Sequence, residues 1–300
     1  MIRSLAALVL VPLFFFLAAP QTPATRFRSG ADAVRVDVQV RQGSRPVPGL
    51  RAADFELRDA GVVQQIEAIS IEDVPVSLML LLDTSASVAG ALLAQLKAAA
   101  HAAVHALTAA DEAALLTFSH QVERPSTFTR DAAALDIAID RMQSSGKTSL
   151  RDAIFTATAL RERASGRAVL LVFTDGKDTS SWLDTRLVVD AALRTDMVIY
   201  GVSSEDARKL SYAKSFYDQE PELFSGPFLE DITERTGGEL LEVKNGRDLA
   251  PAFARIVSDF KSRYLLTYSP RSVPAGGWHP LDVKLKRGRG TVTARRGYYR

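Results

Sequence analysis

Hydrophobic and polar residues alternate in the first part of the chain. Between Val34 and Val40 every second residue is a valine, and the residues between them are polar. This pattern is typical of a β-strand. Similar short patterns cover Phe55–Arg58 and Val62–Ile69, after a turn-rich stretch at Gly43–Gly49. These segments predict a small β module that is too small to fold by itself.

From Val76 onward, continuous apolar runs alternate with amphipathic segments. The apolar runs predict buried strands at Val76–Leu82, Ala113–Phe118, Ala168–Phe173 and Met197–Val202, with a shorter strand at Glu239–Val243. Apolar residues at three- and four-residue steps predict helices between them, over 93–107, 135–142, 150–160, 187–193, 228–236 and 248–260. Strands that alternate with helices favour an α/β fold with a doubly wound, mostly parallel sheet.

Strand-like patterns return after the last predicted helix, at Tyr264–Tyr268, Leu281–Leu285 and Gly290–Tyr299. Because chain ends tend to lie close together, we expect these strands to pair with the N-terminal ones. The α/β domain would then be inserted between two halves of one β module. The expected boundaries are a signal peptide at 1–24, an N-terminal β segment at 31–73, the α/β domain at 74–261, and a C-terminal β segment at 262–300.

The N-terminus has the pattern of a secretory signal peptide. Arg3 precedes an apolar run from Leu5 to Ala19, and small residues follow up to Ala24. A membrane anchor is the alternative, but the run is shorter than the ~20 residues that a spanning helix needs. We therefore expect export to the periplasm or the extracellular space, and a mature chain without a membrane span. The chain has no cysteine, so its stability must come from its core and not from disulfides.

Charge gives no reason to expect a nucleic-acid partner. The formal net charge is only +2. The C-terminal end is locally basic, which could favour an anionic surface. However, its basic residues alternate with apolar ones at Leu281–Leu285, which favours a strand with one face in water.

Oxygen-bearing side chains follow two of the predicted buried strands. The motif Asp83-x-Ser85-x-Ser87 comes directly after the first strand, Asp175 ends another, and Thr148 precedes a helix. Loops beyond the carboxyl ends of parallel strands meet at one edge of a sheet, so these five side chains can converge. An all-oxygen set suits Mg²⁺, with Mn²⁺ or Ca²⁺ as alternatives. The serines taken alone would also be ordinary helix N-caps.

This pattern resembles the von Willebrand factor type A (vWA) domain family. Its metal-ion-dependent adhesion site uses an acid-x-Ser-x-Ser motif, a distant Thr and a distant Asp, which match Asp83, Ser85, Ser87, Thr148 and Asp175. The resemblance covers roughly Val74–Lys261, with agreement also at Asp111–Ser119 and Gly146–Ile154. It implies a Rossmann-like sheet and metal-mediated protein binding.

The flanks resemble a secreted bacterial subgroup, the VWFA-related acidobacterial type. The matching segments are Pro48-Gly49-Leu50, Asp54-Phe55, Tyr268-Ser269-Pro270 and Arg296-Gly297-Tyr298. This subgroup implies no particular activity. The expected function is that of an exported adhesion protein that captures an acidic residue of a protein partner through the bound metal.

Two other functions are weighed against this one. The metal could merely order the loops of a scaffold whose β module makes the contacts, or the protein could be a metal-assisted hydrolase. The hydrolase lacks an evident general base and nucleophile, and no Gly-x-Ser-x-Gly motif surrounds Ser119 and His120. We therefore do not expect an enzyme.

Candidate partner-binding residues lie on either side of the metal motif. Lys147 precedes Thr148 and places a cation beside the expected site, where it could either weaken metal binding or favour an acidic partner. Tyr212, Phe216 and Tyr217 belong to a long connection after a strand, which would begin on the metal side; a surface excursion without function is the alternative.

One pair of histidines and two further acids are assigned lesser roles. His101 and His105 stand four residues apart on a predicted helix, a spacing that can bind Zn²⁺. No third ligand is evident, so partly exposed histidines are favoured. Asp152 is expected to cap a helix or order a loop, and Asp178 to be solvated.

Overall fold

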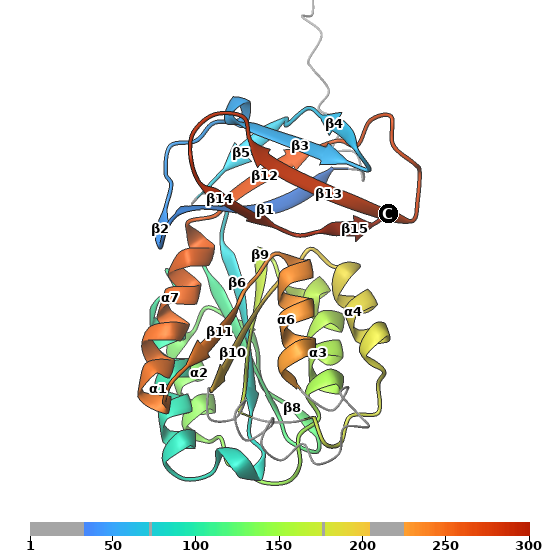
Figure 1. The fold of residues 1–300 in the computed structure, drawn as a ribbon. Helices are drawn as coiled ribbons and strands as arrows, with labels where there is room; N and C mark the ends of the chain where they lie inside the picture. Colours follow the sequence, from blue (N-terminus) through green and yellow to red (C-terminus); the bar gives the residue numbers. More distant parts are fainter. Residues whose placement is uncertain (1–32, 72–73, 176–177, 205–224) are drawn as a thin grey trace, which may run out of the picture. The chain divides into compact units, whose positions relative to one another are not determined.

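The computed structural model describes residues 33–71, 74–175, 178–204 and 225–300 (Figure 1). Within these ranges, no helix is both long enough and apolar enough to cross a membrane. The expected signal peptide lies outside the described residues, and so do Tyr212, Phe216 and Tyr217.

A six-stranded sheet forms the centre of the α/β part, in the order β11-β10-β9-β6-β7-β8. Its strands are β6 (Val76–Asp83), β7 (Glu112–Phe118), β8 (Val122–Thr129), β9 (Arg167–Thr174), β10 (Val198–Ser204) and β11 (Leu240–Val243). All neighbours pair in parallel except β8, which is antiparallel to β7. The sequence did not predict β8. It is mostly polar and contains Pro125, which an edge strand tolerates.

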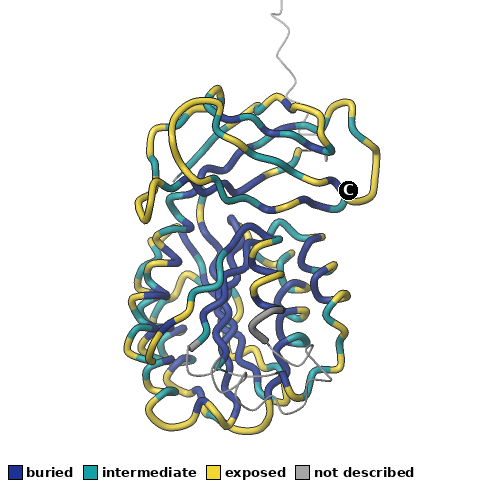
Figure 2. The backbone as a smooth tube through the Cα atoms, viewed as in Figure 1, coloured by how far each residue is buried: buried dark blue, intermediate teal, exposed yellow. Residues whose placement is uncertain are grey.

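Helices cover both faces of this sheet, so the prediction of a doubly wound α/β fold is confirmed (Figure 1). They are α1 (Ala91–His105), α2 (Ala132–Asp140), α3 (Leu150–Ala159), α4 (Thr185–Leu193), α6 (Ser225–Thr236) and α7 (Leu249–Lys261). One core cluster joins the sheet to α1, α2 and α7, and another joins it to α3, α4 and α6. Strand β6 lies between them: Leu80 belongs to the first cluster and Leu81 to the second, and every residue of the strand is buried (Figure 2).

The two flanks together form the expected β module, which confirms that part of the fold prediction. In one sheet β1 (Val34–Gln42) pairs with β12 (Tyr264–Tyr268), β14 (Thr291–Ala294) and β2 (Arg45–Pro46), and β12 also pairs with β5 (Ala68–Ser70). In the other, β13 (Trp278–Leu285) pairs with β3 (Phe55–Asp59) and β15 (Gly297–Tyr299), and β3 with β4 (Val62–Gln64). Both sheets contribute to one apolar cluster, with Val38 from β1 and Leu57 from β3.

Strand β1 is buried on both faces, although its sequence alternates. Its valines belong to the core of the β module, whereas Asp37 lies close to Arg167 at the start of β9. The Arg167 Nε donates a 2.8 Å hydrogen bond to Asp37 Oδ1, and the guanidinium lies 4.8 Å from the centre of the Phe260 ring. A buried ion pair therefore joins the β module to the central sheet, and removing one partner would leave an uncompensated buried charge.

Candidate metal site at the carboxyl edge of the sheet

The carboxyl ends of β6 and β9 bring the acid-Ser-Ser motif and the second acid together. Asp83 is the last residue of β6, and Asp175 follows β9 directly. The Ser87 Oγ donates a 2.8 Å hydrogen bond to Asp175 Oδ1 and lies 2.9 Å from Ser85 Oγ. The main-chain N–H of Ser85 in turn donates a 2.8 Å hydrogen bond to Asp83 Oδ1. A continuous set of hydrogen bonds thus links four of the five predicted ligands.

Thr148 reaches this edge in a third loop. The N–H of Ser145 donates to the Thr84 carbonyl at 2.8 Å, and the N–H of Ala86 donates to the Gly146 carbonyl at 3.0 Å. These bonds hold the loop of Thr148 beside the loop of Ser85 and Ser87. None of the hydrogen bonds found within the described ranges joins the Thr148 side chain to the other four residues. The role of all five residues as metal ligands stays a prediction.

Gly146 has a conformation that this junction requires. Its φ angle is +77°, a region that other residues rarely adopt. A Cβ atom built on it would lie 2.3 Å from Nδ1 of His120. The φ angle therefore favours glycine at this position, and a larger residue would also have to displace the exposed His120 side chain between β7 and β8.

Asp83 is a buried acid whose negative charge is not balanced by a cationic side chain among the described residues. It is 0 % exposed. Burial raises the pKa of Asp83 to about 6, hydrogen bonds from Ser85 and Thr174 oppose this rise, and the nearby charge of Asp175 adds to it. Burial also raises the pKa of Asp175, against the hydrogen bond from Ser87. Among the described residues, no Lys, Arg or His forms an ion pair with Asp83.

This donor set fits a hard divalent cation. Two close carboxyl groups whose ionised forms are disfavoured would both be stabilised by a positive ion between them. The hydroxyls of Ser85 and Ser87 add neutral oxygen donors of the kind that Mg²⁺ accepts. Ser87 is exposed while Ser85 and Asp83 are buried, so the group opens to solvent at Ser87.

A polar cleft lies next to this group of side chains. It has a volume of about 470 Å³. Its lining includes Thr84, Ser119, Gln121, Arg124, Arg141 and Ser145. Thr84 and Ser145 are joined by the hydrogen bond between the two site loops, so the cleft begins at the edge of the candidate metal site. Its hydroxyls and its two guanidinium groups, which outnumber the one carboxylate of Glu123, would suit a polar or acidic segment of a ligand.

The loop after β9 adds an exposed aromatic residue that the sequence analysis did not single out. Trp182 is 95 % exposed. The main-chain N–H of Trp182 donates a 3.0 Å hydrogen bond to Asp152 Oδ2. In the same loop, the Thr179 N–H donates a 2.8 Å hydrogen bond to the Thr148 carbonyl. Asp152 therefore orders this loop, as predicted. A solitary Trp in a polar loop gives no periodic signal from which its exposure could be predicted.

Asp178 differs from its prediction as a solvated residue. It is only 2 % exposed, and it accepts hydrogen bonds from the main-chain N–H of Arg151 at 2.9 Å and from its Nε at 3.1 Å. The N–H of Ser181 donates to its other oxygen at 3.0 Å. The prediction was wrong because these donors surround the carboxylate and replace water. Lys147, in contrast, is exposed next to Thr148.

A family model for the von Willebrand factor type A domain matches residues 78–177, a range that includes all five predicted ligands. The chain contains a von Willebrand factor type A domain. The family assignment made from the acid-x-Ser-x-Ser motif is thus confirmed. No curated protein matches the sequence.

Two solved structures share the fold of the vWA domain at low sequence identity. A von Willebrand factor type A protein from Catenulispora acidiphila is 14% identical with a TM-score of 0.53, and the match covers 91% of this chain and 74% of that one. Proximal thread matrix protein 1 from the mussel byssus is 12% identical with a TM-score of 0.53, over 68% of this chain and 51% of that one. At such identities the likeness shows the fold alone.

Proposed function

We propose that this vWA domain binds a protein partner through a divalent cation held at the carboxyl edge of its sheet. Mg²⁺ is the expected ion. The observation that carries the proposal is the hydrogen-bonded set from Asp83 through Ser85 and Ser87 to Asp175. It combines two carboxyl groups of raised pKa with hydroxyl oxygens that can bind a metal. Within the part of the chain that the structure describes, no Lys, Arg or His forms an ion pair with Asp83.

In this proposal Asp83, Ser85, Ser87, Thr148 and Asp175 hold the ion. When bound, the ion supplies positive charge and a coordination position for an incoming carboxylate. The rigid end of β6 fixes Asp83, because its neighbour Thr84 donates its N–H to the Phe118 carbonyl of β7 at 2.7 Å. The exposed Ser87 marks the side from which an acidic residue of the partner approaches.

Surrounding residues would select the partner. Lys147 and the arginines of the polar cleft favour an acidic segment, and Trp182 offers an exposed apolar surface near the Thr148 loop. An aromatic side chain next to a charged recognition site is a common binding anchor. This arrangement supports a binding protein whose ligand is an acid-containing peptide segment.

Selection of peptides from a random display library tests the partner chemistry. The immobilised protein is incubated with the library in Mg²⁺, and bound peptides are eluted with a chelator. We expect Asp or Glu at a fixed position in the eluted peptides, and loss of this enrichment with Asp83→Ala. Asp282→Ala, at a half-exposed aspartate on β13, is the control and should retain it. Equal enrichment with Asp83→Ala, or peptides without an acid, would contradict the proposal.

We further propose that the chain is exported and that its signal peptide ends within Ala19–Ala24. The charge and apolar pattern of the N-terminus supports this. Mass spectrometry of the protein recovered from outside the cytoplasm would give the new N-terminus. An intact Met1 on the recovered protein would contradict cleavage.

A further inference from the structure

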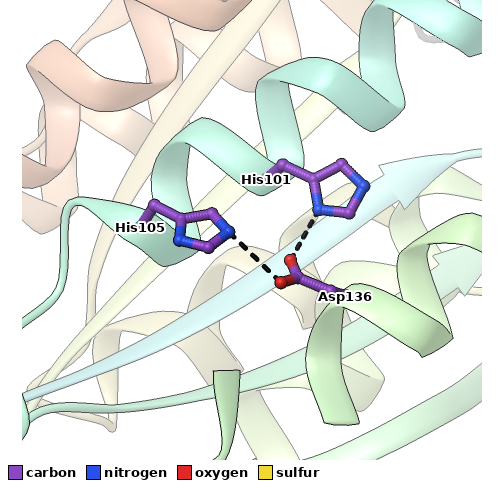
Figure 3. A group of neighbouring side chains, drawn as sticks. All are labelled: His101, His105 and Asp136. Carbon is purple, nitrogen blue, oxygen red and sulfur yellow. Dashed lines mark hydrogen bonds and ion pairs between the residues drawn. The ribbon is translucent and has the colours of Figure 1, made fainter. Parts of the chain in front are cut away.

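Helices α1 and α2 face each other with two pairs of metal-ligating side chains. His101 and His105 lie one helical turn apart on α1, and Asp136 and Asp140 lie one turn apart on α2. Residues four apart share one face of a helix. Figure 3 shows both imidazole rings directed at the Asp136 carboxylate. The two pairs lie on separate elements, so the sequence did not show that they meet.

The distances within this cluster are close to those of a metal site. Nδ1 of His101 lies 2.6 Å from Asp136 Oδ1, and Nε2 of His105 lies 3.2 Å from Asp136 Oδ2. The ligand atoms of the three residues all lie within 4.8 Å of one another. Two donors bound at about 2.0 Å to a tetrahedral zinc ion lie about 3.3 Å apart. Small rotations of the side chains are thus enough to surround one ion.

Asp140 completes the arrangement without contacting the ion position. Its Oδ1 lies 3.0 Å from His101 Nε2, which is the ring nitrogen that faces away from Asp136. A carboxylate in this place fixes the orientation of a metal-bound imidazole and increases its basicity. Two neutral imidazoles and two carboxylates also balance the charge of a divalent ion.

We propose that His101, His105 and Asp136 bind one Zn²⁺ ion, at a second site separate from the oxygen site of Asp83. Two nitrogens and one oxygen suit zinc and not magnesium, which prefers oxygen donors alone. Three protein ligands leave a fourth position open. The side chains of His101 and His105 are 27% and 62% exposed, so the ion and a fourth donor can enter from solvent.

The alternative is an ion pair between the helices without a metal. In that case a protonated His101 would hold Asp136 and Asp140, and zinc would have no specific effect. A specific zinc site and a metal-free ion pair therefore differ in whether zinc binds and whether its binding requires both His105 and Asp136. A zinc site needs both residues, whereas adventitious zinc on exposed histidines would not depend on Asp136.

Calorimetric titration with Zn²⁺ tests the proposal on the chelator-treated protein in excess Mg²⁺, which keeps zinc from the oxygen site. We expect one zinc ion per chain, and at least a tenfold loss of affinity in His105→Ala and in Asp136→Asn. Asp140→Asn should bind zinc roughly tenfold more weakly. This is the lower end of the loss in metal affinity that follows when a hydrogen-bond partner of a metal ligand is removed. His120→Ala, an exposed histidine outside the cluster, is the matched control and should bind like the wild type.

Visible absorption of Co²⁺ bound in place of zinc gives a second measurement. A purely structural role of His101, His105 and Asp136 would produce no such absorption. A four-coordinate site gives intense visible bands, and these should appear in the wild type and disappear in His105→Ala while circular dichroism shows an unchanged fold. Absence of saturable zinc binding in the wild type would overturn the proposal. Equal zinc affinity in the wild type, His105→Ala and Asp136→Asn would overturn it as well. Neither result would affect the Mg²⁺ site, which lies on other residues.

Discussion

Two carboxyl groups, Asp59 in the β module and Asp83 at the end of β6, are both 0 % exposed but have different surroundings. Asp59 Oδ2 accepts hydrogen bonds from the hydroxyls of Tyr268 at 2.9 Å and Tyr298 at 2.8 Å, and its Oδ1 lies 2.8 Å from Nδ1 of His279. Asp83 accepts hydrogen bonds from Ser85 and Thr174 and is repelled by Asp175, an acid that also has a raised pKa.

The difference shows that burial alone does not make a binding site. Both oxygens of each acid have hydrogen-bond partners, but those of Asp59 are two tyrosine hydroxyls and His279, so this acid serves the fold of the β module. The surroundings of Asp83 leave negative charge that a cation would neutralise. What separates a structural acid from a candidate ligand is therefore the charge of its neighbours and not the number of its hydrogen bonds.

The largest effect is expected from removing the structural acid. Asp59→Ala leaves two tyrosine hydroxyls and His279 without their buried partner, so the free energy of unfolding should fall by about 3 to 5 kcal/mol. Urea unfolding followed by fluorescence measures this. Asp282→Ala, at a half-exposed position on β13, should change it by less than ~0.5 kcal/mol. A loss below ~1 kcal/mol in Asp59→Ala would show that the network does not stabilise the module.

A change of opposite sign is expected at Asp83. Asp83→Asn keeps the size and an acceptor for the Ser85 N–H while it removes a buried charge. Since burial raises the pKa of Asp83 to about 6, the metal-free variant should be more stable than the wild type at pH 7, by up to about 3 kcal/mol. Urea unfolding in the presence of a chelator measures the gain. A destabilisation as large as that of Asp59→Ala would contradict the comparison.

The pattern of the sequence could predict the sheet and the position of Asp83 and Asp175 at its carboxyl edge, but not the surroundings of Asp59 and Asp83. Apolar runs such as Val76–Leu82 define strands locally, and the end of a parallel strand has a fixed place in the fold. The partners of Asp59 come from residues 209, 220 and 239 positions away, on strands whose register no local pattern encodes.

The same reason applies to other residues that were missed or misjudged. Asp136 contacts His101 only because α2 packs against α1, and Asp178 is buried only because Arg151 and Ser181 surround it. Strand β8 lacks an apolar run because it lies at the edge of the sheet. Local patterns thus predict elements, whereas side-chain environments depend on packing between elements.

The pH dependence of stability should separate Asp83 from other acids. Between pH ~4 and ~6 the folded protein holds a proton at Asp83 that the unfolded chain has released, so the free energy of unfolding falls as pH rises through this window. The stability gap between Asp83→Asn and the wild type should be below ~1 kcal/mol at pH 4 and largest above pH 7. Unfolding of both proteins at several pH values, without metal, measures it. A gap that does not change with pH would contradict the raised pKa.

Asp111 provides the opposite case within the same protein. Burial would raise its pKa, but hydrogen bonds from Lys261, the Val76 N–H and Thr108 outweigh this and hold it at about 2. Its contribution to stability is therefore present above pH ~4 and is lost as pH falls toward 2. Because both proteins contain Asp111, this effect cancels in the gap between Asp83→Asn and the wild type.

The smallest effect is expected at Lys147, the exposed cation beside Thr148. Lys147→Ala removes a repulsion between the lysine and the bound ion, so Mg²⁺ should bind slightly more tightly, by less than ~1 kcal/mol. Because salt screens exposed charges, the gain should decrease at high ionic strength. Titrations at low and high salt measure both quantities. A loss of Mg²⁺ binding would show instead that Lys147 supports the fold of the site.

Mg²⁺ binding to the wild type and to Asp83→Asn, measured side by side by calorimetry at pH 7.5, tests the central claim most directly. We predict saturable binding of one Mg²⁺ ion to the wild type that is lost in Asp83→Asn, although the metal-free variant is at least as stable as the wild type. Equal Mg²⁺ binding by the two proteins, or none by the folded wild type, would contradict the assignment of Asp83 as a metal ligand.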